Sequence, residues 1–374
     1  MNLTGTHGTR RAPLLLALLA ATLAGCSTAP HYALRQRTSF IALSDFSGFT
    51  RATNATPGQI VLTSPVINPP LAWNELIVSW NATGAPLRVE ARGIYPNHPT
   101  RFYNLGSWSE DSTRYPRASA SRQSDADGFV KIDTLILSHP GAAVQLRLTL
   151  GAPDSPTPAQ LKFIGLSFCD TRAQLAPAAP NRAAWGRELP VPQLRQAEYA
   201  GGIGWCSPAA LTMVLNYWSE TLHRPELMRT VPEVADGVFD AGYGGTGNWP
   251  FNTAYAGKFP GLRAYVTRLN DLSEVEDWIV AGIPPILSVS SYLTNDQHSG
   301  PDNGHLIVCT GFTAQGDVIA NNPGVSVKTN QPARQIYPRE RVINAWQKSK
   351  NAVYLIYPET ADLPPNRSGN WAPK

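Results

Sequence analysis

Charged residues are scarce in this chain of 374 residues. They make up 16% of the sequence, whereas an average soluble protein has about 25%. Lysine is rarest, with 7 Lys against 24 Arg, and no run of basic residues marks a surface for nucleic acid. Long charged helices, coiled coils and nucleic-acid binding are therefore not expected. Proline (33) and glycine (30) are abundant and indicate short elements joined by many turns.

Long apolar runs are also missing, apart from residues 12–24, which follow Arg10 and Arg11. This run is shorter than the roughly 20 residues that a membrane-spanning helix needs. It therefore predicts a secretory signal peptide over residues 1–25. The run ends in Leu-Ala-Gly before Cys26, which resembles the bacterial lipoprotein signal, where the cysteine is lipidated and becomes the mature N-terminus. The resemblance implies an outer-membrane lipoprotein of the cell envelope, periplasmic or surface-facing, that contacts the membrane only through its lipid.

Cysteine is scarce as well. Apart from Cys26, the chain has only Cys169, Cys206 and Cys309. Three is an odd number, so in an oxidising compartment at least one thiol stays free unless it pairs with another chain. No Cys and His residues have the spacing of a zinc site, so no metal is expected, and no other cofactor either.

The composition divides the rest of the chain at a linker. Residues 38–172, after an N-terminal linker at 26–37, alternate apolar and polar residues in short runs, as in Val144-Gln145-Leu146-Arg147-Leu148. This period of two predicts an antiparallel β-sandwich. Residues 173–190 have no periodicity and hold three prolines, as expected of an interdomain linker. A second domain over 191–358 is predicted to have one long helix, then loops, then strands. The tail, 359–374, is expected to be frayed.

A candidate nucleophile lies at the start of the predicted helix. Cys206 follows a glycine-rich segment and precedes apolar residues at helical spacing: Ala210, Met213, Val214, Tyr217 and Trp218. At a helix N-terminus, the helix dipole and the free backbone N–H groups favour a thiolate, which is the nucleophilic form. The alternative is a buried cysteine with a purely structural role.

A candidate base lies about 100 residues later. His305 begins an apolar strand that ends at Phe312, and the segment TAQGD then leads into a second strand at 318–320. This hairpin brings the Asn-Asn-Pro-Gly segment back beside the histidine, where Asn322 can orient the ring as in a catalytic triad. His298 is the competing base.

This combination resembles the C39-type papain-like peptidases, and in particular the C39-like family of secreted bacterial proteins. The resemblance rests on WCSPAALTMVLNYW, GHLIVCTGF and VIANNPG, at 205–218, 304–312 and 318–324. It implies a papain-like α+β domain with Cys206 as nucleophile and His305 as base. Asn322 would orient His305, where the commonest family pattern has Asp.

The same resemblance implies a glutamine that helps to form the oxyanion hole. Gln196 is favoured over Gln193 for this role, and the side chain of Asn321 is expected to point away from the site. Residues 242–251 are rich in glycine and aromatics. They predict a mobile loop that brings Tyr243 and Trp249 to bind substrate; a structural turn is the alternative.

The sequence thus predicts an α+β chain with an N-terminal β-sandwich and a papain-like (C39-type) domain. The expected activity is that of a monomeric thiol hydrolase, a cysteine peptidase acting on peptides or cell-envelope material. The alternatives are a peptidoglycan amidase or transpeptidase with the same three groups, and a non-enzymatic binding or adhesion protein.

Overall fold

The computed structural model of the protein describes residues 36–53, 56–120, 122–155, 159–175, 178–293 and 302–373. All of them belong to one compact unit. The predicted signal peptide, Cys26 and His298 lie outside the described residues. Within the described part of the chain, no helix is long and apolar enough to cross a membrane.

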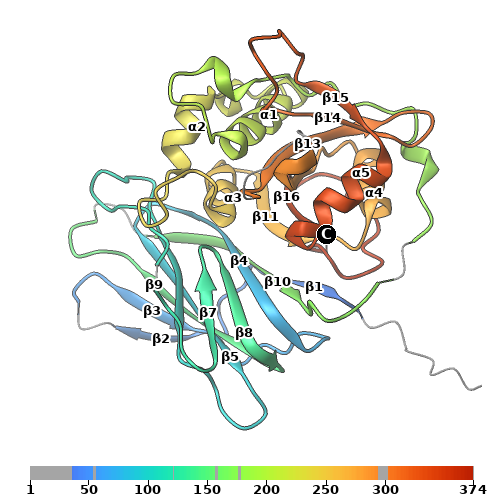
Figure 1. Cartoon of the computed structure of the whole chain (residues 1–374). Coiled ribbons are helices and arrows are strands. Elements are labelled where there is room, and N and C mark those ends of the chain that lie inside the picture. The colour runs from blue at the N-terminus through green and yellow to red at the C-terminus, as the bar shows by residue number, and fades with distance from the viewer. Residues whose placement is uncertain are drawn as a thin grey trace, which may run out of the picture. The chain divides into compact units, whose positions relative to one another are not determined.

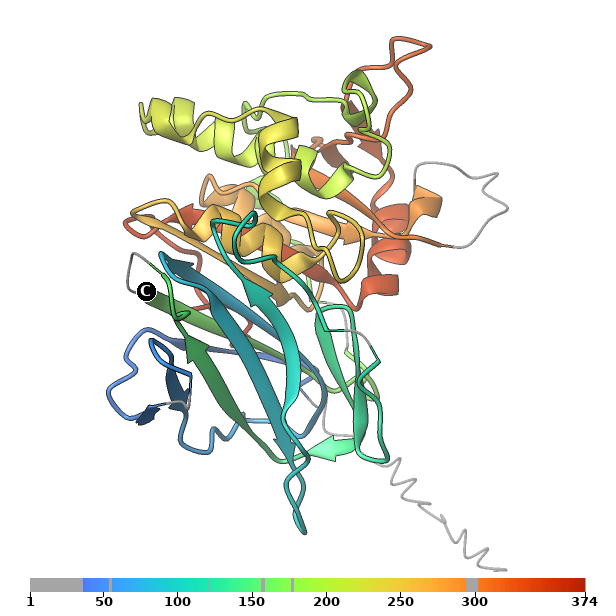
Figure 2. The same ribbon diagram turned by 90° about the vertical axis from the view of Figure 1, so that its left-hand side faces the viewer.

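The N-terminal half, coloured blue to green in Figures 1 and 2, is built from strands. They form two five-stranded antiparallel sheets with the orders β1-β10-β4-β8-β7 and β2-β3-β9-β5-β6. The strands are β1 (Thr38–Leu43), β2 (Thr50–Thr53), β3 (Ile60–Thr63), β4 (Trp73–Thr83), β5 (Leu87–Ile94), β6 (Tyr103–Trp108), β7 (Gly128–Lys131), β8 (Thr134–Gly141), β9 (Ala143–Leu150) and β10 (Gln160–Cys169).

Side-chain alternation explains how these two sheets meet. In β9, Leu146 and Leu148 are buried, whereas Arg147 between them points to the opposite, partly exposed face. Gly93 in β5 lies so close to β8 that a Cβ atom built on it would be 2.7 Å from Leu137 Cδ1. The two sheets therefore contact each other through small and apolar side chains, and the predicted alternation along β9 is confirmed.

The C-terminal half is a mixed α/β unit around a six-stranded sheet with the order β11-β16-β12-β13-β14-β15. Its strands are β11 (Leu262–Arg268), β12 (Ile286–Val289), β13 (His305–Phe312), β14 (Val318–Asn321), β15 (Arg334–Tyr337) and β16 (Ala352–Pro358). Its helices are α1 (Cys206–Thr221), α2 (Val231–Val238), α3 (Trp249–Gly257), α4 (Leu272–Val280) and α5 (Arg339–Trp346). The predicted long helix is α1, and the predicted hairpin is β13–β14.

The prediction of a single helix was wrong, because α2 to α5 were missed. These helices have only eight or nine residues each, too few for a periodic pattern to stand out. Three of them begin at a side chain that caps the helix. Thr230 forms a capping box with Glu233, while Asn248 and Asp271 accept from the Phe251 and Ser273 N–H groups.

Strand β4 joins the two halves, since both of its faces are buried. Its polar side chains lie against β11, an edge strand of the six-stranded sheet. The Asn81 amide donates to the Ala264 carbonyl (2.7 Å) and accepts from the Ala264 N–H (3.2 Å), as a neighbouring strand would. Ser79 Oγ accepts from the Val266 N–H at 2.9 Å. Side chains of the N-terminal half therefore occupy backbone groups that would otherwise be open at this edge.

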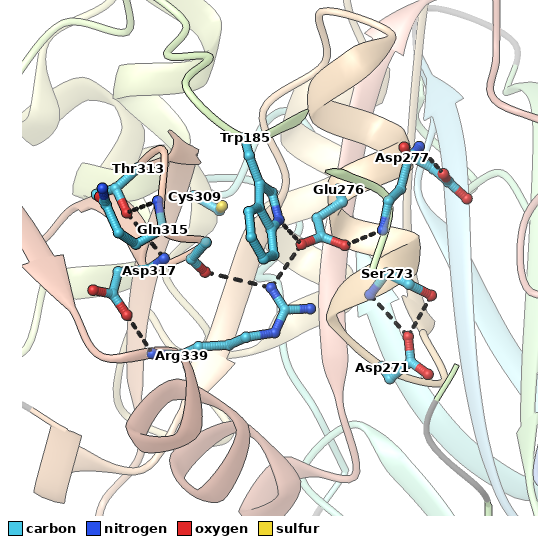
Figure 3. Close-up of polar contacts among 12 residues, drawn as sticks. Trp185, Asp271, Ser273, Glu276, Asp277, Cys309, Thr313, Gln315, Asp317 and Arg339 are labelled. Carbon is cyan, nitrogen blue, oxygen red and sulfur yellow. Dashed lines mark hydrogen bonds and ion pairs between the residues drawn. The ribbon is translucent and has the colours of Figure 1, made fainter. Parts of the chain in front are cut away.

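The predicted linker is fixed to the C-terminal half. Leu189 N–H donates to the Thr310 carbonyl at 2.7 Å, so this segment runs along β13. The fully buried Glu276 of α4 accepts from Trp185 Nε1 (2.8 Å), the Asn181 N–H (2.6 Å) and Arg339 Nη1 (2.6 Å). Figure 3 shows how this carboxylate connects the linker with α4 and α5.

The tail is also packed, which contradicts the expectation that it is frayed. Trp371 is only 1% exposed, and its ring meets that of Trp278 in α4 at 5.4 Å between centroids. Trp371 Nε1 donates to the Pro364 carbonyl at 3.2 Å. Burial of this large aromatic side chain outweighs the weak local preferences of the surrounding Pro, Asn and Ser residues.

Candidate active site

Cys206 is the first residue of α1 and is half-buried. The chain reaches it through a tight glycine-rich turn. A Cβ atom at Gly202 would lie 1.9 Å from the Gln196 carbonyl oxygen, so only glycine fits there. Gly204 has φ of 89°, a left-handed conformation that favours glycine. The turn delivers the sulfur to the start of the helix, where backbone N–H groups are not used within the helix.

His305 begins β13 and is 8% exposed. Its Nε2 atom lies 2.7 Å from Asn322 Oδ1. The side chains of His305 and Cys206 lie close enough to shift each other's pKa. Since Nε2 faces Asn322, Nδ1 is the ring nitrogen left for the sulfur. The structure thus brings Cys206, His305 and Asn322 together at one site, with His305 hydrogen-bonded to Asn322.

Cys206 and His305 shift each other's proton affinity. Burial raises the pKa of Cys206, but the hydrogen bond and charge of His305 and backbone hydrogen bonds with Leu306 and Ser207 outweigh it, so this pKa is lowered. Burial lowers the pKa of His305, but Cys206 and the hydrogen bond with Asn322 outweigh it, so this pKa is raised. Both shifts favour a thiolate beside an imidazolium.

Asn322 follows β14 directly and is 1% exposed. Its Oδ1 accepts from the Gly324 N–H at 2.8 Å as well as facing His305, and its Nδ2 donates to the Tyr337 hydroxyl at 2.7 Å. Asn321 points elsewhere and donates to the carbonyls of Val191 (3.0 Å) and Pro192 (3.2 Å). The Asn321 side chain thus points away from His305, as expected from the sequence.

Gln196 lies beside the same turn. Its N–H donates to the Pro323 carbonyl at 2.9 Å, and its Oε1 is buried without a hydrogen-bond partner among the described residues. Gln193 is engaged elsewhere, because its Oε1 accepts from the Arg334 N–H at 2.9 Å. Of the two candidate glutamines, Gln196 is thus the one bonded to the Asn322-Pro323 turn.

The aromatic segment after α2 is ordered by one carboxylate. Asp240 Oδ1 accepts from Gly242 N–H (2.9 Å), Tyr243 N–H (3.1 Å) and the Ser119 N–H of the N-terminal half (2.8 Å). Thr246 Oγ1 reaches the Gly204 carbonyl at 3.4 Å, which sets this loop beside the turn before Cys206. Tyr243 is 49% exposed.

The sequence predicted that Trp249 lies in a loop, but the structure places it in a helix. It is the first residue of α3 and is half-buried. Its N–H donates to Asp133 Oδ2 at 2.9 Å. Asp133 belongs to the N-terminal half and is buried, and this burial raises its pKa to about 6. The helix starts here because Asn248 caps it and Pro250 suits its first turn.

The remaining thiols differ from Cys206. Cys169 and Cys309 are both buried and free. Burial raises the pKa of Cys169 and raises that of Cys309 to about 12. In the part of the chain that the structure describes, no three His, Cys, Asp or Glu residues are grouped so as to hold a metal ion.

Two family models match the chain. Residues 188–354 match the Peptidase_C39 like family, and residues 28–167 match the Peptidase C39 N-terminal domain. The chain belongs to the C39-like peptidase family. The resemblance predicted from the sequence is confirmed, and the second match extends it to the N-terminal half of this C39-like protein.

Similar solved structures are distant. A proposed C39-like peptidase from Bacillus anthracis is 18% identical, with a TM-score of 0.31, and the match covers 45% of this chain and 97% of that one. The CBM22-1-GH10 modules of xylanase 10B from Clostridium thermocellum are 11% identical, with a TM-score of 0.16, and cover 41% of this chain and 31% of that one. Likeness at this level adds nothing to the assignment. No curated protein matches the chain.

Sequence reasoning missed three groups beside the site of this C39-like protein. The Tyr337 hydroxyl accepts a hydrogen bond from Asn322, and the Tyr354 hydroxyl lies 2.9 Å from Ser207 Oγ. Asp133 accepts from the N–H of the first residue of α3. Both tyrosines lie in strands, where a tyrosine reads as an ordinary apolar residue. Asp133 lies in a turn of the other half, so no local pattern connects it with Cys206.

Proposed function

We propose that this protein is a thiol hydrolase that cleaves peptide or amide bonds with Cys206 as nucleophile, His305 as general base and acid, and Asn322 as the residue that orients His305. The observation that carries this proposal is the group of three side chains in which His305 is hydrogen-bonded to Asn322 through Nε2 and interacts with Cys206 closely enough that each shifts the pKa of the other. It occurs in a member of a peptidase family.

In the proposed reaction, the Cys206 thiolate attacks the carbonyl carbon of the scissile bond. The His305 imidazolium then gives its proton to the leaving amine, and a thioester remains on Cys206. A water molecule next gives a proton to His305 and attacks the thioester. The acid product leaves, and the thiolate–imidazolium pair is restored.

The negative oxygen of each tetrahedral intermediate needs hydrogen-bond donors. The Cys206 N–H, at the start of α1, and the amide NH2 of Gln196 are the proposed donors. The attachment of Gln196 to the Pro323 carbonyl supports this role, because it holds the glutamine near the triad. One such donor contributes roughly 2.7–4 kcal/mol to transition-state stabilisation.

Substrate is proposed to bind along the loops next to Cys206. Ile203 is 91% exposed and Tyr243 is 49% exposed, and both lie in loops that meet at the Thr246–Gly204 contact. Exposed apolar side chains at the rim of a site favour a substrate with an apolar side chain near the scissile bond. Trp249, which is half-buried at the start of α3, is proposed to add to this surface.

The proposal also includes the domain organisation and the membrane anchor of the chain. We take the two sheets of the N-terminal half as a β-sandwich and residues 191–358 as a papain-like unit, in a chain that acts as a monomer. Cys26 is proposed to carry a lipid that anchors the protein to the outer membrane. A Cys26→Ser variant should then leave the membrane fraction; retention there with an acyl label would contradict the anchor.

Activity is tested with the purified protein on a panel of peptides and cell-wall fragments. Cys206→Ala and His305→Ala should each abolish hydrolysis and keep the circular dichroism spectrum of the native protein. Turnover by Cys206→Ala would contradict the proposal. Cleavage of cell-wall fragments alone would indicate an amidase or transpeptidase. No turnover, together with a Cys206 that iodoacetamide does not label, would favour a binding protein.

A further inference from the structure

The orientation of the Asn322 amide decides what His305 meets. An amide group presents an acceptor on one side and a donor on the other. The Oδ1 atom must face Nε2 if Asn322 is to accept a hydrogen bond from the imidazolium ring. Because Asn322 is 1% exposed, bulk solvent does not reach the opposite end of the amide, which needs a partner within the protein.

The contacts of the amide divide cleanly between its two ends. Oδ1 faces two N–H donors, those of His305 Nε2 and the Gly324 backbone, at 2.7 and 2.8 Å. Nδ2 has the Tyr337 hydroxyl as its acceptor, at 2.7 Å. Tyr337 ends β15, is 8% exposed, and pairs with Val318 of β14, four residues before Asn322. The hydroxyl is therefore held by the same sheet that carries the asparagine.

We propose that Tyr337 is a positioning residue for the reaction, which acts on His305 only through the amide of Asn322. Its hydroxyl satisfies the buried Nδ2 group, fixes the plane of the amide, and polarises it so that Oδ1 becomes a better acceptor for the imidazolium proton. This role rests on the proposed function of Cys206 and His305 and deepens it.

The Tyr337 hydroxyl keeps its proton at neutral pH. Burial raises the pKa of Tyr337, while the hydrogen bond with Asn322 and the charge of Arg341 lower it, and the net pKa is above the ordinary value. The phenol therefore stays neutral at neutral pH, and its oxygen accepts from Nδ2 without adding a charge beside His305. A phenylalanine would fill nearly the same volume but leave the Nδ2 donor buried and unpaired, which is the costly case for a hydrogen bond.

Tyr337→Phe should lower kcat/KM about tenfold, the factor that about 1.4 kcal/mol of lost transition-state stabilisation produces. The loss should fall on kcat, with KM unchanged, because no substrate contact is removed. The pH profile should also narrow. A weaker bond from Asn322 lets the pKa of His305 fall, and a less stable imidazolium lets the pKa of Cys206 rise. A purely structural role would move neither limb of the profile.

Tyr357→Phe is the matched control. Tyr357 lies in β16 of the same sheet. The substitution removes its buried hydroxyl, which lies 3.0 Å from the hydroxyl of Tyr265 in β11. It should lower thermal stability to a similar degree and leave both limbs of the pH profile in place.

A double-mutant cycle tests whether Tyr337 acts through Asn322. In an Asn322→Ala background, Tyr337→Phe should have no further effect on kcat/KM. Additive losses, or an unchanged pH profile for Tyr337→Phe, would overturn the proposal. The rate of iodoacetamide alkylation against pH gives the same readout without any substrate. If Cys206→Ala keeps its hydrolytic activity, the proposed function fails, but the alkylation profile still tests the link between Tyr337 and the Cys206–His305 pair.

Discussion

Gly324 offers a way to displace the His305 ring without replacing any of the three proposed catalytic and orienting residues. A Cβ atom built on this glycine would lie 2.7 Å from His305 Cε1, 3.1 Å from Nε2 and 3.3 Å from Asn322 Oδ1. Its φ is not in the left-handed region, so the backbone accepts alanine. Ordinary contacts of this kind are about 3.5–4.0 Å long, so the ring must move by roughly 1 Å. A displacement of that size can reduce catalysis about 100-fold.

The measurement is kcat/KM of Gly324→Ala, together with its thermal melting curve. Activity should fall by about two orders of magnitude, while the melting temperature changes little, because a side-chain ring is easier to shift than the backbone. Gly48→Ala is the control, since its nearest neighbour would be Pro65 Cγ at an ordinary 3.9 Å. Full activity in Gly324→Ala would refute the placement of the His305 ring against this turn.

Three further outcomes are expected. At neutral pH, iodoacetamide should label Cys206 faster than Cys309, because the pKa of Cys206 is lowered whereas burial raises that of Cys309 to about 12; equal rates would contradict the thiolate–imidazolium pair. Glu75→Ala removes the carboxylate 2.7 Å from the buried Arg268 and should lower the free energy of unfolding by about 3–5 kcal/mol in urea denaturation, a loss below 1 kcal/mol being contrary to the reasoning. Burial raises the pKa of Asp133 to about 6 from 3.8, so the folded state binds the extra proton and stability should rise as the pH falls through 6 towards 4. Asp133→Asn should remove this part of the pH dependence, and an unchanged dependence would show that another group causes it.

The sequence was sufficient for the parts of the site that lie on long or sharply bounded elements. The apolar stripe after Cys206 predicted α1, and the alternation of apolar strands with a polar turn predicted the hairpin that carries His305 and Asn322. Local hydrophobic patterns decide such elements, so one sequence is enough to find them.

The parts that it missed depend on contacts between distant segments. Trp249 was taken for a loop residue because the helix that it begins is short and rich in small residues. Asn81 has a role only because β4 lies beside β11. Tyr337 acquires one only where β15 meets the end of β14. Strand pairing and the docking of one half on the other brought these residues to their partners, and neither leaves a local signal.

The hydrogen bonds of Asn81 and Ser79 with the edge of β11 limit how the two halves of this protein can recombine in evolution. Two domains joined only by a flexible linker can be recombined with other domains independently of each other. Here, an incoming N-terminal half would have to present an amide and a hydroxyl two residues apart, in register with Ala264 and Val266. A mismatch would leave an exposed strand edge that is open to pairing with other chains. The two halves are therefore expected to be inherited as one piece, with substitutions in β4 compensated in β11.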